Sequence, residues 1–280
     1  MVIEIFCLIC ATALAVTGSL TFWPVTEWYH FYIPIVLALA GYITGISIVW
    51  IFIDISGRII EKQGEKDKVN RFAKAIFNDA MKFFIMHALI IRKTRGFHKL
   101  PRTQSFVLVS NHQSNFDSFI TSRLFGKRDI AFITKKENMK IPLGPRLVRA
   151  MKYLSIDRDD KLQSLQVIRK AVELVKNQVT SVGVYPEGTR AKNCLIGEFH
   201  EGVFNIALHA KAPLVVMTTY GANKIAKRWP FLSTKVYQDI LCVIPYEEIQ
   251  DKPAKEVCEM VKSIMVEHLQ ELDALYGKRK

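Results

Sequence analysis

The first 57 residues of this 280-residue chain contain no lysine and no arginine, and their only acidic residues are Glu4, Glu27 and Asp54. The other 223 residues therefore hold all 39 Lys and Arg, against 23 Asp and Glu. Such a basic balance indicates a polyanionic partner, either nucleic acid or an anionic membrane surface. The sequence has no nucleic-acid-binding motif, internal repeat or low-complexity tract. We therefore expect anionic membrane lipids, and no nucleic acid, as partners.

Charge is also missing from two long apolar runs near the start of the chain. Val2–Trp23 has 22 residues with the single charge of Glu4, and Tyr32–Ile53 has 22 residues with none. As a helix each run would be ~33 Å long, enough to cross a hydrocarbon core of ~30 Å. The first run lacks the basic start and the small-residue cleavage site of a secretory signal. We predict a membrane helical hairpin over residues 1–57 that spans the bilayer, with insertion into one leaflet as the alternative.

The position of the basic residues predicts which way the hairpin faces. Six lysines and arginines follow the second run between residues 58 and 74, whereas the connection between the two runs has none. By the positive-inside rule, residues 58–280 face the cytoplasm, on the inner membrane of a cell. Residues 58–95 are predicted to form a basic amphipathic linker. Its helix, over residues 69–91, either lies on the membrane or packs against the domain that follows.

Cysteines are few and scattered, which argues against a disulfide framework. Five is an odd number, and it favours reduced thiols on the cytosolic side. Cys7 and Cys10 have C-x-x-C spacing but lie in an apolar run with no second pair, so packing is expected rather than metal binding. The seven His residues are dispersed as well. We therefore expect no metal and no cofactor.

Beyond residue 96 the pattern alternates between short apolar runs and helical periodicity. This alternation predicts an α/β fold in which a mostly parallel central sheet has helices on both faces. Strands are expected at 105–110, 130–134, 153–156, 181–185 and 213–219, and helices at 115–125, 160–177, 201–211 and 253–276.

A first group of polar residues follows the strand predicted at 105–110. In sheets of this kind ligands bind at the carboxyl ends of strands. Asn115 is a candidate helix N-cap, which would put Asp117 in the first helical turn. Asp117 can then accept a hydrogen bond from Nδ1–H of His112 and leave Nε2 as a general base. The group reads Asn111-His112-Gln113-Ser114-Asn115-Phe116-Asp117.

A second group, Tyr185-Pro186-Glu187-Gly188-Thr189-Arg190, follows the strand predicted at 181–185. Pro186 and Gly188 favour a tight turn, and Gly188 allows a ligand to approach the backbone closely. Arg190 offers a planar fork of donors suited to a phosphate. Taken alone, this group is equally compatible with an ordinary turn and a solvated arginine.

Together with Ile156-Asp157-Arg158 and Ala212-Pro213-Leu214-Val215, the two groups resemble the motifs of the bacterial 1-acyl-sn-glycerol-3-phosphate acyltransferases, of the glycerolipid acyltransferase superfamily. The resemblance runs from about residue 96 to 216, and it implies an acyltransferase catalytic domain over residues 96–280. It departs from the family pattern at His200, where a lysine is usual, and at Val216, where a proline is usual.

The resemblance implies a role for each matching residue. His112 would be the catalytic base and Asp117 its partner. The phosphate of the substrate would be bound by residues of three motifs: Lys135 (or Lys136 if the register slips by one), Arg158, and Glu187, Gly188, Thr189 and Arg190.

The reaction implied is transfer of a fatty acyl group from acyl-carrier protein or acyl-CoA to the 2-hydroxyl of lysophosphatidate. Two alternatives stay open. One is an acyltransferase that acts on glycerol 3-phosphate or another lysophospholipid, and the other is a non-catalytic membrane adaptor with the same fold.

Overall fold

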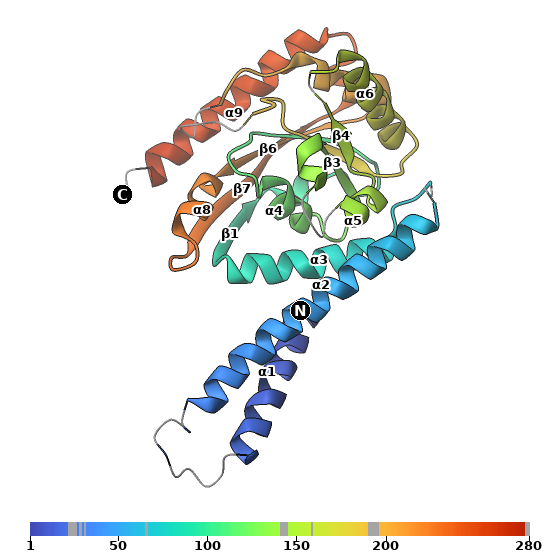
Figure 1. The fold of residues 1–280 in the computed structure, drawn as a ribbon. Helices are drawn as coiled ribbons and strands as arrows, with labels where there is room; N and C mark the ends of the chain where they lie inside the picture. The colour runs from blue at the N-terminus through green and yellow to red at the C-terminus, as the bar shows by residue number, and fades with distance from the viewer. Residues whose placement is uncertain are drawn as a thin grey trace.

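Two apolar helices project together from one end of the protein, α1 (Val2–Thr21) and α2 (Ile33–Lys62) (Figure 1). The computed structural model describes residues 1–21, 27, 30, 32–64, 67–140, 145–157, 159–189 and 196–277, without the side chains of Asn138 and Lys140. Both helices are long and apolar enough to cross a membrane, and only 11% of their most apolar windows is buried within the protein. This exposed apolar surface associates the chain with a membrane.

Small residues let the two helices cross closely. A Cβ added at Gly41 would lie 2.5 Å from the backbone oxygen of Cys10, and one added at Gly45 would lie 2.9 Å from Cα of Cys7. Gly41 and Gly45 are four residues apart, so they share one face of α2. This G-x-x-x-G spacing is typical of helix pairs in membranes, where small residues bring the backbones together.

The rest of the chain folds around a seven-stranded sheet in the order β1-β7-β6-β2-β5-β3-β4. Five strands run parallel to one another, while β7 is antiparallel to β6 and parallel to β1. The predicted, mostly parallel sheet is therefore confirmed. The strands are β1 (Ile90–Arg95), β2 (Val107–Ser110), β3 (Ile130–Lys135), β4 (Leu154–Ile156), β5 (Ser181–Val184), β6 (Leu214–Tyr220) and β7 (Thr234–Ile244).

Helices cover both faces of this sheet, as expected, because successive residues of the central strands point to opposite sides. Val107 and Val109 of β2 belong to one core cluster and Leu108 to the other. The first cluster lies under α6 (Lys161–Lys176), α7 (Asn205–Ala210) and α9 (Ala254–Tyr276). The second lies under α2, α3 (Arg71–His87) and α5 (Pro145–Ala150). Two further helices, α4 (Asp117–Leu124) and α8 (Ile225–Arg228), follow β2 and β6.

The helix predicted over residues 69–91 is shorter than expected. It ends at His87, and Leu89 has φ of +52°, a left-handed conformation that stops the helix before β1 begins at Ile90. Ala73 and Phe77 are buried in the second core, so α3 packs against the domain. The predicted helix at 201–211 is divided into a 3₁₀ turn, Glu201–Phe204, and α7.

Helix α2 continues past residue 57 and is fastened to the domain by ion pairs. Arg146 of α5 contacts Asp54 and Glu61 at 2.8 Å each, and Arg149 contacts Glu61 at 2.7 Å. The hydrogen bond from Arg146 lowers the pKa of Glu61. Helix α2 crosses the expected boundary at 57, because it reaches Lys62, and β1 ends at the boundary at 95 but belongs to the sheet of the domain that follows. The division into three domains stays a prediction.

Candidate active site

The two polar groups lie side by side because the strands before them are neighbours. β2 pairs in parallel with β5, Val109 being opposite Val184. Residues 111–117 follow β2 and residues 185–189 follow β5, so both groups emerge at the same edge of the sheet. This is the carboxyl edge, where ligands bind in open α/β sheets.

His112 and Asp117 have the geometry that their spacing predicts. His112 Nδ1 lies 2.9 Å from Asp117 Oδ2, and the Asp117 side chain is fully buried. The same oxygen accepts hydrogen bonds from the backbone N–H groups of Gln113, at 2.6 Å, and Ser114, at 2.7 Å. Three donors on one carboxylate oxygen fix the turn and orient the imidazole. Nε2 of His112 makes no hydrogen bond within the described part of the chain and is left for a substrate.

The expected cap at Asn115 is wrong. Phe116 is the N-cap of α4 and makes no side-chain cap bond. Asp117 instead closes the turn by binding the backbone of Gln113 and Ser114, which lie before the helix. Its carboxylate thus serves the turn and the helix start together, and no separate capping side chain is needed.

Two side chains fix this turn to its neighbouring strands. Asn111 donates to the backbone oxygen of Thr219 at 2.9 Å and accepts from its N–H at 2.7 Å, which ties the turn to the end of β6. Glu187 accepts the N–H of His112 at 2.8 Å and that of Gly197 at 3.0 Å. Burial raises the pKa of Glu187 against the effect of these bonds. Sequence reasoning gave Asn111 no role, although it has both a donor and an acceptor directly after a strand.

The ring of Tyr185 stacks on His112, with centroids 4.6 Å apart and planes at 24°. Tyr185 stacks in turn on Phe132 of β3, at 5.7 Å. Burial holds the pKa of Tyr185 well above its ordinary value, with the charge of Asp117 adding to the shift, so the ring is a neutral surface. The stack restricts the imidazole from the side that Asp117 does not contact. Sequence reasoning did not single out this contact.

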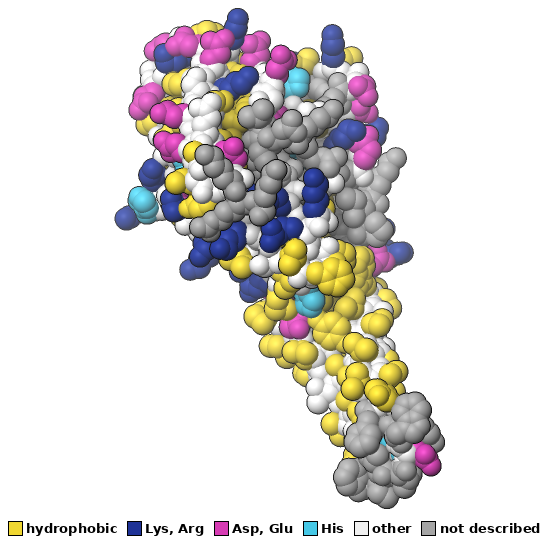
Figure 2. Space-filling model, turned by 90° about the vertical axis from the view of Figure 1, so that its left-hand side faces the viewer, with side chains coloured by type: hydrophobic (Ala, Val, Ile, Leu, Met, Phe, Trp, Pro, Cys, Tyr) yellow, Lys and Arg dark blue, Asp and Glu magenta, His cyan; other side chains and the backbone are white. Residues whose placement is uncertain are grey.

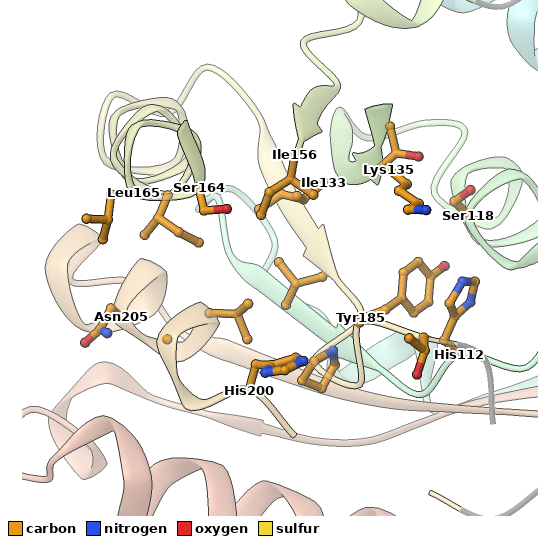
Figure 3. Close-up of a pocket in the computed structure, with 18 of the residues that line it drawn as sticks. His112, Ser118, Ile133, Lys135, Ile156, Ser164, Leu165, Tyr185, His200 and Asn205 are labelled. Carbon is orange, nitrogen blue, oxygen red and sulfur yellow. The ribbon is translucent and has the colours of Figure 1, made fainter. Parts of the chain in front are cut away.

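A cavity of about 1830 Å³ opens at this edge of the sheet. Figure 3 shows His112, Ser118 and Lys135 at one end of it, and Ser164, Leu165 and Asn205 at the other. The first end is polar. Between the two ends lies an apolar part of the wall, with side chains from β3, β4, β5 and α6: Ile133, Ile156, Val184, Leu165, Ile168 and Val172. Polar and charged side chains of α6, such as Arg169 and Lys176, also line the cavity. The cavity therefore presents a charged end next to the candidate base and an apolar arm leading away from it.

The apolar arm explains a helix face that periodicity alone left ambiguous. The predicted helix at 160–177 is confirmed as α6, with Asp160 capping it through the N–H of Gln163. Its apolar residues form two stripes: Val167, Ala171, Leu174 and Val175 are buried in the core, whereas Leu165, Ile168 and Val172 line the cavity. An apolar stripe wider than one core face is the signal that could have located the cavity.

The candidate phosphate-binding residues are placed as follows. Lys135 lines the cavity and forms an ion pair with Glu137 at 3.4 Å, whereas Lys136 forms an ion pair with Asp157 at 3.4 Å and does not line it. Gly188 and Thr189 line it too, and Gly188 has φ of +64°, a conformation that favours glycine. The two oxygens of Glu187 are both held by backbone amides. Arg158, Arg190 and Cys194 lie outside the described residues.

Comparison with known proteins agrees with this fold. The model of the Acyltransferase family matches residues 92–219. The chain is 27% identical to 1-acyl-sn-glycerol-3-phosphate acyltransferase alpha of Bos taurus over 182 residues, which is 64% of this chain and 63% of that protein. It is 33% identical to the chloroplastic 1-acyl-sn-glycerol-3-phosphate acyltransferase BAT2 of Brassica napus over 132 residues, 47% of this chain and 38% of that protein. The chain thus spans less than two thirds of these relatives.

A solved structure has the same fold. The crystal structure of the 1-acyl-sn-glycerophosphate acyltransferase PlsC from Thermotoga maritima superposes with a TM-score of 0.62 and 22% identity, covering 81% of this chain and 94% of that one. The matched family region contains β2, β5 and both polar groups at their carboxyl ends. The resemblance seen in the sequence is confirmed over this region, since residues 92–219 match the Acyltransferase family model.

Proposed function

We propose that this protein transfers a fatty acyl group from an acyl thioester to the 2-hydroxyl of 1-acyl-sn-glycerol 3-phosphate and so forms phosphatidic acid. The observation that carries the proposal is the contact of His112 with Asp117 at 2.9 Å, at the charged end of a cavity with an apolar arm. A lysophosphatidate has the matching chemistry, with a phosphate and a free hydroxyl at one end and an acyl chain at the other. The names of the relatives from Bos taurus and Brassica napus support the same acceptor.

The proposed chemistry uses His112 as general base. Nε2 takes the proton of the acceptor hydroxyl while its oxygen attacks the thioester carbonyl carbon. The tetrahedral intermediate then collapses, the carbon–sulfur bond breaks, and the imidazolium returns the proton to the leaving thiolate. Asp117 holds Nδ1–H and stabilises the positive charge that His112 carries between these steps. No acyl-enzyme is required, because the acceptor hydroxyl is itself the nucleophile.

The other polar residues of the site would bind the phosphate of the acceptor or position His112. Lys135, Arg158, Thr189 and Arg190 would bind the phosphate, with Gly188 allowing a close approach of the backbone. Glu187 would act indirectly, because a carboxylate repels phosphate and its oxygens already hold the backbone of His112 and Gly197. The donor would be acyl-carrier protein or acyl-CoA, both of which are anionic and suit the basic balance of residues 58–280.

The proposed location is the inner membrane, with the catalytic domain facing the cytoplasm and bound to anionic lipids. The basic residues after α2 support this orientation. Lysophosphatidate would then reach the cavity laterally from the inner leaflet, and a soluble donor would reach it from the cytoplasm.

The deciding experiment is a thiol-release assay on the purified full-length protein in mixed micelles. Acyl-CoA and acyl-carrier protein are tested as donors with lysophosphatidate, glycerol 3-phosphate, lysophosphatidylcholine and no acceptor. Release that depends on lysophosphatidate is expected, with phosphatidic acid as the lipid product. Release only with one of the other acceptors would identify a different acyltransferase, and no release with any of them would favour a non-catalytic adaptor.

A further inference from the structure

The loop between α8 and β7, residues 229–233, carries large apolar side chains that are exposed on the surface. Phe231 is 87% exposed, more than any other large apolar side chain in the described part of the chain, and Leu232 and Trp229 are 57% and 56% exposed. Isolated apolar side chains on a surface are ordinary, but three within four residues form a patch. In Figure 1 this loop lies level with α3, at the end of the domain from which α1 and α2 project.

The loop is joined to the membrane hairpin through one residue of α3, His87. Nε1 of Trp229 donates to the backbone oxygen of His87, at the end of α3, at 3.1 Å. His87 Nε2 lies 2.6 Å from the hydroxyl of Tyr42 in α2 and 3.7 Å from the carboxylate of Glu4 in α1. One residue therefore connects the loop to both apolar helices, and the loop lies where these helices meet the domain.

Exposed apolar side chains continue between the hairpin and the loop. Ile55 and Ile59 of α2, Phe72 at the start of α3, and Met86 and Leu89 at its end are all exposed. Leu89 is also bonded to the strand that follows the loop, since its backbone oxygen accepts the N–H of Thr234 at 2.9 Å. Exposed apolar side chains therefore lie on α2 and at both ends of α3, the elements next to the loop.

The charged residues that precede and follow the loop in the sequence are basic, and Glu4 on α1 is the acidic side chain that contacts His87. No Asp or Glu occurs between residues 202 and 238, nor between residues 80 and 116, the two segments that meet here through β1 and β7. Basic residues accompany the loop instead: Lys227 and Arg228 precede it, and Lys235 follows it, opposite Ile91 of β1. Figure 2 shows lysine and arginine side chains gathered where the apolar stalk joins the domain.

We propose that residues 229–233 form a second membrane contact, separate from the hairpin. Trp229, Phe231 and Leu232 insert into the interfacial layer of the bilayer, and Lys227 and Arg228 lie against anionic lipid headgroups. An apolar tip flanked by cations is the pattern that binds the surface of an anionic bilayer. Trp229 is suited to this depth, because its ring is apolar and its N–H is already satisfied by His87.

This contact gives the cavity a fixed position on the membrane. Asn223 and Lys227, just before the loop, line the same cavity as His112. With the hairpin on one side and the loop on the other, the domain is held at two points, so it cannot swing about α2 alone. The wall of the cavity that carries Lys227 then faces the headgroup layer, from which a lipid substrate has to come.

The test measures the depth of Trp229 in the full-length protein, independently of its activity. The chain has four tryptophans, so replacing Trp23, Trp28 and Trp50 by Phe leaves Trp229 as the only emitter. The protein is reconstituted into phosphatidylcholine vesicles with and without phosphatidylglycerol, each prepared with and without bromine on the acyl chains. We expect bromolipid to reduce the Trp229 emission at least twofold, with stronger quenching when phosphatidylglycerol is present.

The matched control moves the tryptophan to an exposed apolar position far from the hairpin. Leu162→Trp, with the four native tryptophans replaced by Phe, places it on α6, where Leu162 is 74% exposed. Its emission should be insensitive to bromolipid. Equal emission of Trp229 with and without bromine would overturn the proposal. Quenching of the same size with and without phosphatidylglycerol would show that Lys227 and Arg228 make no contact with anionic headgroups. Circular dichroism of both variants checks that they are folded.

Discussion

Glu187 holds the backbone of His112: its carboxylate accepts the histidine N–H at 2.8 Å. The two residues come from different strand ends, β5 and β2, so this hydrogen bond joins the two motifs into one site. With Asp117 on Nδ1 and Tyr185 on the ring face, His112 is constrained from three directions. Its remaining freedom is the Nε2 edge, where the proposed chemistry takes place.

Removing the proposed base should abolish turnover without unfolding the protein. We expect His112→Ala to lower kcat on the order of 10³-fold or more, because proton transfer contributes about that much. Asp117→Asn should leave a much weaker enzyme, since the imidazole loses the partner that fixes its tautomer. The measurement is thiol release, with thermal unfolding as the check on folding. If His112→Ala keeps more than a few per cent of activity, the mechanism is wrong.

Glu187 predicts a pH dependence of stability. Its pKa is raised by burial, so the folded state binds its proton more tightly than the unfolded state does. Its contribution therefore favours folding at low pH and is lost as the pH rises through the folded pKa. Relative to Glu187→Gln, the melting temperature of the wild type should fall as the pH rises above the ordinary pKa of a glutamate, about 4.3. A hydrogen bond lost in Glu187→Gln would lower the melting temperature of the variant by the same amount at every pH, so it cannot produce this pH dependence. A difference that stays constant would contradict the prediction.

Two adjacent lysines provide a matched test of phosphate binding. Each lysine forms an ion pair, Lys135 with Glu137 and Lys136 with Asp157, but only Lys135 lines the cavity. We expect Lys135→Gln to raise the KM for lysophosphatidate roughly tenfold, the loss of one charge-assisted contact, and to leave the donor KM nearly unchanged. Lys136→Gln should change neither value. Equal effects of the two substitutions, or equal effects on both substrates, would point to general damage.

The apolar arm of the cavity should select acyl-chain length. Ile168 lines the arm, and a tryptophan there would fill part of the space available to a long chain. We expect Ile168→Trp to lower the rate with long-chain substrates about tenfold relative to short-chain ones, a difference of ~1.4 kcal/mol. Leu162→Trp, on the same helix but outside the cavity, is the control and should keep the wild-type preference. Unchanged preference in both variants would place the acyl chain elsewhere.

The orientation of the hairpin can be tested with a single cysteine. Thr26→Cys, in a chain whose five native cysteines are replaced, places a thiol in the connection between α1 and α2. We expect a membrane-impermeant thiol reagent to label it on intact cells, because two helices of at least 20 residues can cross a bilayer. Labelling only after the inner face is opened would put the connection inside. No labelling in either case would leave it within the bilayer.

The parallel core of the fold could be predicted from sequence because its central strands are apolar along their whole length. β2, β5 and β6 are buried on both faces, so they read as short apolar runs between turns. β1 was missed because it is an edge strand with four charged or polar residues, and its two isoleucines continue the apolar stripe of α3. The left-handed backbone of Leu89, which separates the two elements, has no sequence signal in a leucine.

The contacts of the candidate site that lie within one sequence motif could be predicted, whereas those between motifs could not. The hydrogen bond between His112 and Asp117 follows from five residues of spacing at a strand end. The stack of Tyr185 on His112 could not be predicted, because it depends on the distance between two neighbouring strands. The insertion of the loop at 229–233 had no signal either: Trp229, Phe231 and Leu232 read as an ordinary apolar run until their exposure is known.

Helix α2 runs unbroken for 30 residues from the apolar stalk to its ion pairs with α5. Because α2 is one continuous helix, the orientation of the domain relative to the apolar helices depends on the number of residues in α2. Each residue inserted between Gly45 and Asp54 would turn the domain by about 100° and lift it by about 1.5 Å. One extra residue would turn the cavity mouth away from its proposed position facing the lipid, while seven would restore its direction about 10 Å higher. In the proposed membrane arrangement, the length of α2 therefore determines whether the mouth of the cavity faces the lipid that supplies the substrate.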